Sequence, residues 1–307
     1  MYTSVLVPFD FSPDACYVVE CLRTFSGLDR VVLLHVTVDR RIGSMRAAVP
    51  GDAAEYARFR LDQFRKSLGP TPWFVESRVE MRSGTPFSEV VNRVADEEGV
   101  SLVAMGKRGL GVIETLLVGS SASEILRYGR QDVLLVHSPA QPESRADGGV
   151  GRYPDLFSRV LVCSDFSAPE VAETCAAVLP HSAPLTLFHV VESGESLEEV
   201  HDHCAVARAR LEELAAAVSG GRASVHVSLR AGDAAAEILG YAGEKDVGLI
   251  AVKSGGIRGI LHAILGSTSI TVVRDADRPV LVLRSPGPAG APPAGAVEEG
   301  GPASTPR

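Results

Sequence analysis

The sequence has little of what marks a nucleic-acid-binding or membrane protein. Its 307 residues carry a net charge of −8, so no excess of positive charge is available to attract a nucleic-acid backbone or an anionic membrane surface. Apolar runs such as residues 31–36 and 133–136 are far too short to cross a bilayer, and the segment MYTSVLVPFD does not resemble a signal peptide. We therefore expect a cytoplasmic protein that binds neither nucleic acid nor a membrane.

Several motifs of catalysis are also missing. The patterns Gly-x-Ser-x-Gly, His-Glu-x-x-His and Gly-x4-Gly-Lys-Ser/Thr do not occur, so the sequence gives no support for a serine hydrolase, a zinc protease or a Walker-type nucleotide hydrolase. The five cysteines form no Cys-x-x-Cys pair, which is typical of reduced thiols in the cytosol. Cys163, in the apolar run VLVC, is interpreted as a buried, inert thiol, with a reactive thiol beside a cleft as the alternative.

A few histidines invite other interpretations. His201 and His203 stand beside Cys204, but the two histidines are two residues apart on a predicted helix and so point to different faces. We interpret this segment as a solvated helix and expect no metal site. His35 and His189 end apolar runs and are expected to be hydrogen-bonded near the core.

An internal repeat organises the chain. The segment SVLVPFDFSPDA (4–15) matches RVLVCSDFSAPE (159–170), and five further blocks recur in the same order. These blocks pair residues 31–38 with 185–192, 80–91 with 228–239, 101–111 with 248–258, 117–126 with 265–273, and 132–139 with 279–286. Six matches in one order indicate a duplication and predict two domains of the same fold.

The boundaries of the two units follow from composition. The predicted domains are residues 1–140 and 156–285, joined by a polar linker with Gly and Pro at 141–155. The segment 286–307 is rich in Pro, Gly and Ala, so we expect a disordered tail, with a docking or regulatory tail as the alternative.

Within each unit, short apolar runs alternate with amphipathic helical stretches. In the first unit we predict strands near 4–8, 31–37, 74–81, 101–105 and 132–137, and helices near 13–26, 53–68, 86–98 and 119–128. This alternation is typical of an α/β fold in which helices cover both faces of a parallel sheet. Such sheets bind ligands beyond the carboxyl ends of their strands, where the strand order reverses.

A Gly-rich pattern lies where that rule places a ligand. Gly106 follows an apolar strand, Gly109 comes after two further residues, Gly119 comes after nine more, and Ser120 and Ser121 open the next helix. Glycine lets the backbone approach a ligand closely, and the N–H groups of a helix N-terminus suit phosphate. The pattern therefore predicts a nucleotide phosphate loop, although Ser120 is also a reasonable N-cap.

Asp10 is the second candidate. It follows the apolar run VLVPF, so its carboxylate can accept hydrogen bonds from ribose hydroxyls or an adenine amine. The alternative is an N-cap for the helix that begins at Pro13, a role for which Ser12 competes.

Together, the strand-Asp-x-Ser segment, LLHV, Arg-x-Gly-x-Pro, the Gly-Ser pattern and the closing strand DVLLV resemble the universal stress protein family, in particular its tandem-domain members. The resemblance implies a five-stranded parallel sheet of order 3-2-1-4-5 in each domain and association of the domains through their last strands. It also implies that members with the full Gly pattern bind ATP, with Mg²⁺ as a possible companion, while other members do not.

Carried over to this sequence, the resemblance assigns Asp10 to adenosine and the backbone of Val36 to adenine. The ribose and phosphates would be held by the remaining motif residues, namely Gly106, Gly109, Gly119, Ser120 and Ser121. Either Lys107 or Arg108 would reach phosphate, and the resemblance does not decide between them.

The second copy departs from the pattern at its first glycine. Lys253 stands where the first copy has Gly106, and its side chain either fills the ribose space or reaches phosphate. The rest of the pattern persists as Asp165, Val190, Gly256, Gly266, Ser267 and Thr268. We expect weaker or absent binding in this copy.

The sequence thus predicts an ATP-binding stress or regulatory protein in which nucleotide changes conformation, dimerisation or partners. The motif residues supply no general base, so we expect no enzyme, or at most slow hydrolysis. The alternatives are an enzyme acting at the nucleotide α-phosphate and a scaffold with empty pockets. We also expect the two domains to pair within the chain, because an unpaired last strand favours aggregation, and a homodimer is a further option.

Overall fold

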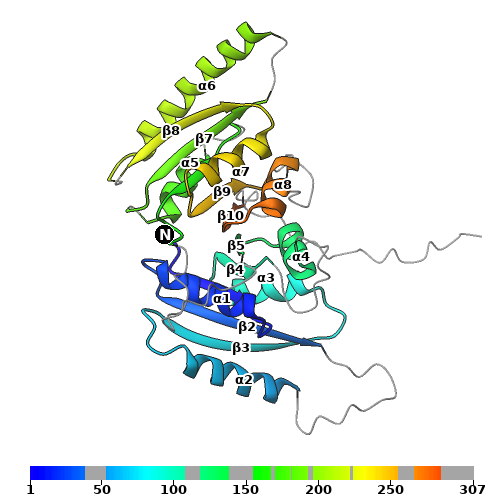
Figure 1. The fold of residues 1–307 in the computed structure, drawn as a ribbon. Helices are drawn as coiled ribbons and strands as arrows, with labels where there is room; N and C mark the ends of the chain where they lie inside the picture. The colour runs from blue at the N-terminus through cyan, green and yellow to red at the C-terminus, as the bar shows by residue number, and fades with distance from the viewer. Residues whose placement is uncertain are drawn as a thin grey trace, which may run out of the picture.

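The computed structural model describes residues 1–38, 53–107, 118–137, 155–166, 170–180, 182–192, 196–221, 224–254 and 266–284. These residues form two copies of one βα unit, stacked end to end in Figure 1. Except for Asp155, the expected linker at 141–155 lies outside the described residues, as do the expected tail at 286–307 and the motif positions Arg108, Gly109 and Gly256.

The elements of the first domain lie close to their predicted positions. Its helices and strands are β1 (Ser4–Pro8), α1 (Pro13–Cys21), the 3₁₀ turn η1 (Leu22–Thr24), β2 (Arg30–Val38), α2 (Ala53–Ser67), β3 (Phe74–Arg82), α3 (Phe87–Glu97), β4 (Leu102–Gly106), α4 (Ser120–Tyr128) and β5 (Asp132–Val136). The first helix is shorter than predicted, because its last turn tightens into η1 and Phe25 then leaves the helical conformation.

The second domain repeats this order with a longer second helix. Its elements are β6 (Val160–Cys163), α5 (Glu170–Val178), β7 (Leu185–Val191), α6 (Leu197–Val218), β8 (Val225–Ala231), α7 (Ala234–Glu244), β9 (Leu249–Lys253), α8 (Ser267–Asp275) and β10 (Val280–Leu283). Within the described residues no helix combines the length and apolar character that a membrane span needs.

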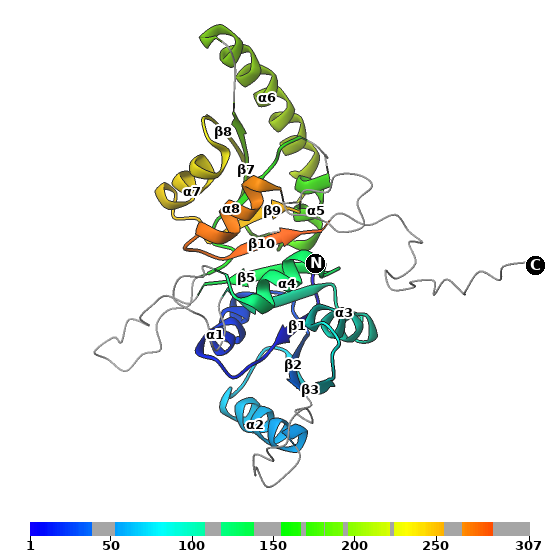
Figure 2. The ribbon, with the colours of Figure 1, turned by 90° about the vertical axis from the view of Figure 1, so that its right-hand side faces the viewer.

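All ten strands form one sheet of order β3-β2-β1-β4-β5-β10-β9-β6-β7-β8. The predicted order 3-2-1-4-5 is confirmed in each domain, and neighbouring strands inside a domain are parallel. The last strands pair antiparallel, with Leu134 opposite Leu281, so the two predicted sheets are continuous across the domain boundary (Figures 1 and 2). Domain association through the last strands is therefore also confirmed.

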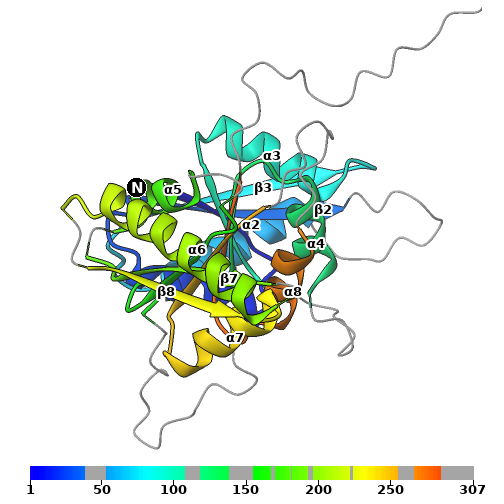
Figure 3. The same cartoon turned by 90° about the horizontal axis from the view of Figure 1, so that it is seen from above.

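Helices cover both faces of this sheet. One buried cluster contains Val18 of α1, Leu61 of α2 and Leu211 of α6, whereas the other contains Val91 of α3 and Ile238 of α7. In Figure 3, α6 and α7 lie on opposite sides of the strands of the second domain. Each cluster includes residues of both domains, so the hydrophobic core runs without interruption across the boundary between β5 and β10, which we call the seam.

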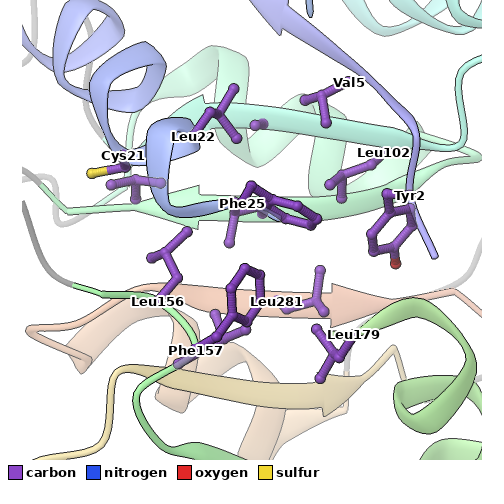
Figure 4. Packing of buried hydrophobic residues seen from close by; sticks show 14 of the residues in the cluster. Tyr2, Val5, Cys21, Leu22, Phe25, Leu102, Leu156, Phe157, Leu179 and Leu281 are labelled. Atoms are coloured by element: carbon purple, nitrogen blue, oxygen red, sulfur yellow. The ribbon is translucent and has the colours of Figure 1, made fainter. Parts of the chain in front are cut away.

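Aromatic packing reinforces the seam on one face. The ring of Phe25, just after η1, meets the ring of Phe157 edge-on with centroids 4.8 Å apart. Leu156, Leu179 and Leu281 surround this pair, and all three are buried (Figure 4). Burying each such side chain stabilises the fold by roughly 1.5–3 kcal/mol, so the two domains share a substantial part of their stabilisation.

A polar cluster crosses the same seam. Asp132 at the start of β5 accepts hydrogen bonds from the Tyr2 hydroxyl (2.5 Å) and from the backbone N–H of Arg284, just after β10 (2.6 Å). The guanidinium of Arg284 donates to the carbonyls of Ile125 (2.9 Å) and Leu126 (2.7 Å) near the end of α4. Burial raises the pKa of the Asp132 carboxyl and lowers the pKa of Arg284.

The raised pKa of Asp132 predicts a pH dependence of stability. Folded Asp132 binds its proton more tightly than unfolded Asp132, so this group stabilises the fold more as the pH falls toward the ordinary carboxyl value of about 4. The unfolding free energy of the wild type, relative to Asp132→Asn, should therefore rise between pH 7 and pH 4.5 in urea titrations. Asp277→Asn, which removes an exposed carboxylate, is the matched control. A difference that stays constant or shrinks over this range would contradict the burial of a charged Asp132.

Candidate functional site

The candidate site lies at the carboxyl ends of β1 and β4. These two strands are neighbours, and β1 also pairs with β2, so the strand order reverses between β1 and β4. Asp10 follows β1, and Gly106 ends β4. The fold therefore brings the two sequence-predicted candidates to the position where open α/β sheets bind ligands.

The geometry of the turn between β1 and α1 shows whether Asp10 is the N-cap of α1. The hydroxyl of Ser12 accepts the N–H of Ala15 at 3.1 Å, which makes Ser12 the N-cap of α1. Asp10 Oδ1 instead accepts the N–H of Ser12 at 3.0 Å, across Phe11, whose φ is +63°. The capping alternative for Asp10 is therefore wrong, and its half-buried carboxylate orders the turn instead.

An aromatic stack supports this turn. The ring of Phe11 lies 4.9 Å from the ring of His35 on β2 and 4.6 Å from the guanidinium carbon of Arg60 on α2. His35 Nδ1 donates to the carbonyl of Phe9 at 2.8 Å, which confirms the expected hydrogen-bonded histidine. Val36 follows His35 on the same strand, so its backbone lies at the same end of the sheet as Asp10.

The second domain repeats this stack. Phe166 has φ of +58° and lies 4.3 Å from the ring of His189 and 5.6 Å from the guanidinium carbon of Arg210. Sequence reasoning missed the stack in both domains. The repeated Asp-Phe-Ser and His-Val segments carried a signal for the aromatic and histidine partners, but Arg60 and Arg210 lie on helices outside the repeated blocks.

The Gly-rich segment is closed at its base by backbone hydrogen bonds. The N–H of Lys107 donates to the carbonyl of Val136, and the N–H of Gly119 donates to the carbonyl of Lys107, both at 2.9 Å. Gly119, not Ser120, is the N-cap of α4, so the N-cap residue has no side chain with which to cap this helix. The first N–H groups of α4, which have no partner within the helix, lie beside the exposed Ser120 and Ser121.

The side chain of Lys107 contacts the second domain. This side chain is 6% exposed, and its Nζ donates to the carbonyl of Ala276 in the second domain at 3.0 Å. Of the two sequence candidates for phosphate, Lys107 is therefore already bound across the seam. Arg108 lies outside the described residues.

The equivalent place in the second domain differs in detail. Lys253 ends β9, and its carbonyl accepts the hydroxyl of Ser269 at 2.9 Å. Helix α8 begins at Ser267 after Gly266, again without a side-chain cap, and includes Thr268. At the other strand, Asp165 is exposed and Val190 is buried, while Ser164 Oγ accepts the N–H of Phe166 at 3.2 Å.

Cys163 lies at the end of β6 beside this second turn. Burial raises the pKa of its thiol to about 12, so the thiolate that reacts with electrophiles is scarce near neutral pH. This supports the interpretation of an inert thiol, although Cys163 is half-buried and not fully buried as expected. In the part of the chain that the structure describes, no three His, Cys, Asp or Glu side chains gather as metal ligands, and His203 lies 4.0 Å from Glu199 on its own helix.

Comparisons with known proteins agree with this architecture. The model of the universal stress protein family matches residues 1–137 and 157–284. A universal stress protein of Methanocaldococcus jannaschii is 27% identical over 157 residues, covering 44% of this chain and 95% of that protein. One from Mycolicibacterium smegmatis is 25% identical over 259 residues, covering 82% of this chain and 85% of that protein. The crystal structure of a universal stress protein from Archaeoglobus fulgidus has a TM-score of 0.61 and 25% identity, covering 92% of this chain and 96% of that chain.

The turn geometry predicts different consequences for two neighbouring substitutions. Ser12→Ala removes the N-cap of α1 and should lower the free energy of unfolding by about 1 kcal/mol. Asp10→Ala removes the hydrogen bond that the Ser12 N–H makes to a half-buried carboxylate, and it should cost only about 0.5 kcal/mol, because water can reach this turn and replace the lost acceptor. Urea denaturation of the two variants measures both values. If Asp10→Ala lowers the free energy of unfolding more than Ser12→Ala does, the main role of Asp10 is to stabilise the fold.

Proposed function

The chain belongs to the universal stress protein family, and from this premise we propose that it is an adenine-nucleotide-binding regulatory protein of the stress response, with ATP as its ligand. One observation carries the proposal. At the reversal of strand order, a carboxylate that is not the N-cap of α1 lies at the same sheet edge as a helix N-terminus whose N-cap is a glycine. The first group suits adenosine and the second suits phosphate.

The proposed binding mode follows the chain from β1 to α4. Asp10 accepts hydrogen bonds from adenosine, and the backbone of Val36 meets adenine. The Gly-rich segment holds the ribose and phosphates through Gly106, Gly109, Gly119, Ser120 and Ser121. Because the Nζ of Lys107 is bound to Ala276, we assign the cation beside phosphate to Arg108, with Mg²⁺ as a possible companion of the phosphates.

We propose a ligand-binding role in place of a catalytic one. We assign Asp10 to adenosine, and the residues assigned to the phosphates are glycines, serines and an arginine, none of which serves as a general base. Nucleotide would then act by changing conformation or partners in a cytoplasmic protein, and hydrolysis would be slow at most.

We propose that the second domain binds nucleotide more weakly. Lys253 brings a long side chain where the first domain has Gly106, and its carbonyl is fixed by Ser269. The second domain still carries Asp165, Val190, Gly266, Ser267 and Thr268 in the matching order, together with Gly256. The second domain therefore keeps most of the motif, but the side chain of Lys253 occupies space that a glycine would leave open for the ligand.

The proposal predicts the nucleotide content of the full chain. Mass spectrometry of ligand released from the purified, denatured protein should find about one equivalent of ATP or AMP, and calorimetric titration of the stripped protein should give one strong site.

Asp10→Ala should weaken the binding of ATP about tenfold or more, as expected for a hydrogen bond to a charged group. Replacing Gly109 by a bulky residue should abolish retention without unfolding the domain. Asp14→Ala, which removes a neighbouring carboxylate on α1, should leave affinity unchanged.

Other outcomes separate the alternative functions. Turnover of nucleotide at its α-phosphate would favour an enzyme, and no released ligand together with no ATP binding would favour a scaffold. Retention that survives the Gly109 substitution would count against this pocket.

A further inference from the structure

Two cations cross the seam in opposite directions. Lys107, just after β4 of the first domain, donates to the carbonyl of Ala276, which is the C-cap residue of α8 in the second domain. Arg284, just after β10 of the second domain, donates to the carbonyls of Ile125 and Leu126 in the last turn of α4 in the first domain. A cation at a helix C-terminus satisfies free carbonyls and is attracted by the helix dipole.

The two helices held in this way are the ones that follow the Gly-rich segments. Helix α4 begins directly after Gly119, and α8 begins directly after Gly266. Each helix therefore has its N-terminus at a candidate phosphate site and its C-terminus bound by a side chain of the other domain.

Lys107 also belongs to the base of the first segment. Its carbonyl accepts the N–H of Gly119 at 2.9 Å, and its own N–H donates to Val136 at the end of β5. Lys107 thus closes the Gly-rich segment through its backbone and binds the second domain through its side chain. A hydrogen bond from Arg274 and, more weakly, the charge of Lys107 lower the pKa of Asp275 at the end of α8.

The second domain has no corresponding side-chain contact at the equivalent position among the described residues. Ser254 follows β9 as Lys107 follows β4, and its N–H donates to Leu283 in the matching way. The hydroxyl of Ser254 is buried and has no hydrogen-bond partner among the described residues. In the first domain, which has the complete motif, the first residue after the strand therefore binds the other domain through its side chain. In the second domain, the corresponding residue does not.

We propose that Lys107 is a positioning residue through which the second domain fixes the base of the first domain's phosphate loop. The second domain is then a working part of the first site, whether or not it binds nucleotide itself. The ligand in this inference rests on the proposed function, but the mechanical link between Gly119 and α8 does not.

The link is tested first without ligand, in the full chain. Lys107→Met removes the donor but keeps an unbranched side chain of similar length, so hydrogen exchange should become about tenfold faster at the amide of Gly119 and in the last turn of α8. Lys66→Met, at an exposed lysine on α2, is the control and should leave both regions unchanged. Unchanged exchange at Gly119 in Lys107→Met would overturn the proposal. If the methionine variant does not fold, Lys107→Gln, whose side chain is uncharged and shorter than that of lysine, should also speed exchange in both regions, and unchanged exchange would count against the link.

The second arm measures binding. Lys107→Met should weaken ATP about tenfold and leave adenosine within about twofold, because the base of the loop at Gly119 serves the phosphates, whereas Asp10 and Val36 hold adenosine. Lys107→Arg should restore most of the ATP affinity. If Lys107 instead leaves the seam to bind phosphate, ATP should speed exchange in α8 of the wild type, and that result overturns the proposal. A wild type that binds no ATP refutes the proposed function, and the ligand-free exchange still decides whether the link exists.

Discussion

The antiparallel ladder between β5 and β10 is the interaction on which the rest of the structure depends. Each domain ends its parallel sheet on an apolar strand, and an edge of this kind exposes unpaired backbone groups. Pairing the two edges satisfies both and lets each of the two buried clusters extend across both domains, one of them through Phe25 and Phe157. The duplication therefore produces one ten-stranded sheet, and neither domain retains a free last strand.

The seam also explains how two similar units take different roles. Its polar groups do not obey the repeat: Asp132, Lys107 and Arg284 correspond in the other copy to Pro279, Ser254 and His137. As a result each domain donates one cation to the last helix of the other, but Lys107 alone follows the first glycine of a complete motif. The two domains thus differ twice: Lys253 replaces a glycine at the second site, and the contact that Lys107 makes with the other domain is present at the first site alone among the described residues.

Much of this architecture could be predicted from the sequence, because strand runs, helix periodicity and the repeated blocks are local patterns. The strand order and the joining of last strands followed from the family resemblance. The details of the site could not be predicted in the same way. Ser12 and Asp10 are both good caps by composition, and only the turn geometry assigns the cap to Ser12. The partner of Lys107 lies 169 residues away, at a backbone carbonyl that no side-chain pattern marks.

The central claim is that the seam makes the two copies one cooperative body. Differential scanning calorimetry of the full chain tests it most directly, because two-state unfolding requires the calorimetric and van't Hoff enthalpies to agree. We predict a single transition in which the two enthalpies are equal. Two resolved transitions, or a van't Hoff enthalpy of about half the calorimetric enthalpy, would show that the domains unfold independently and would contradict the account.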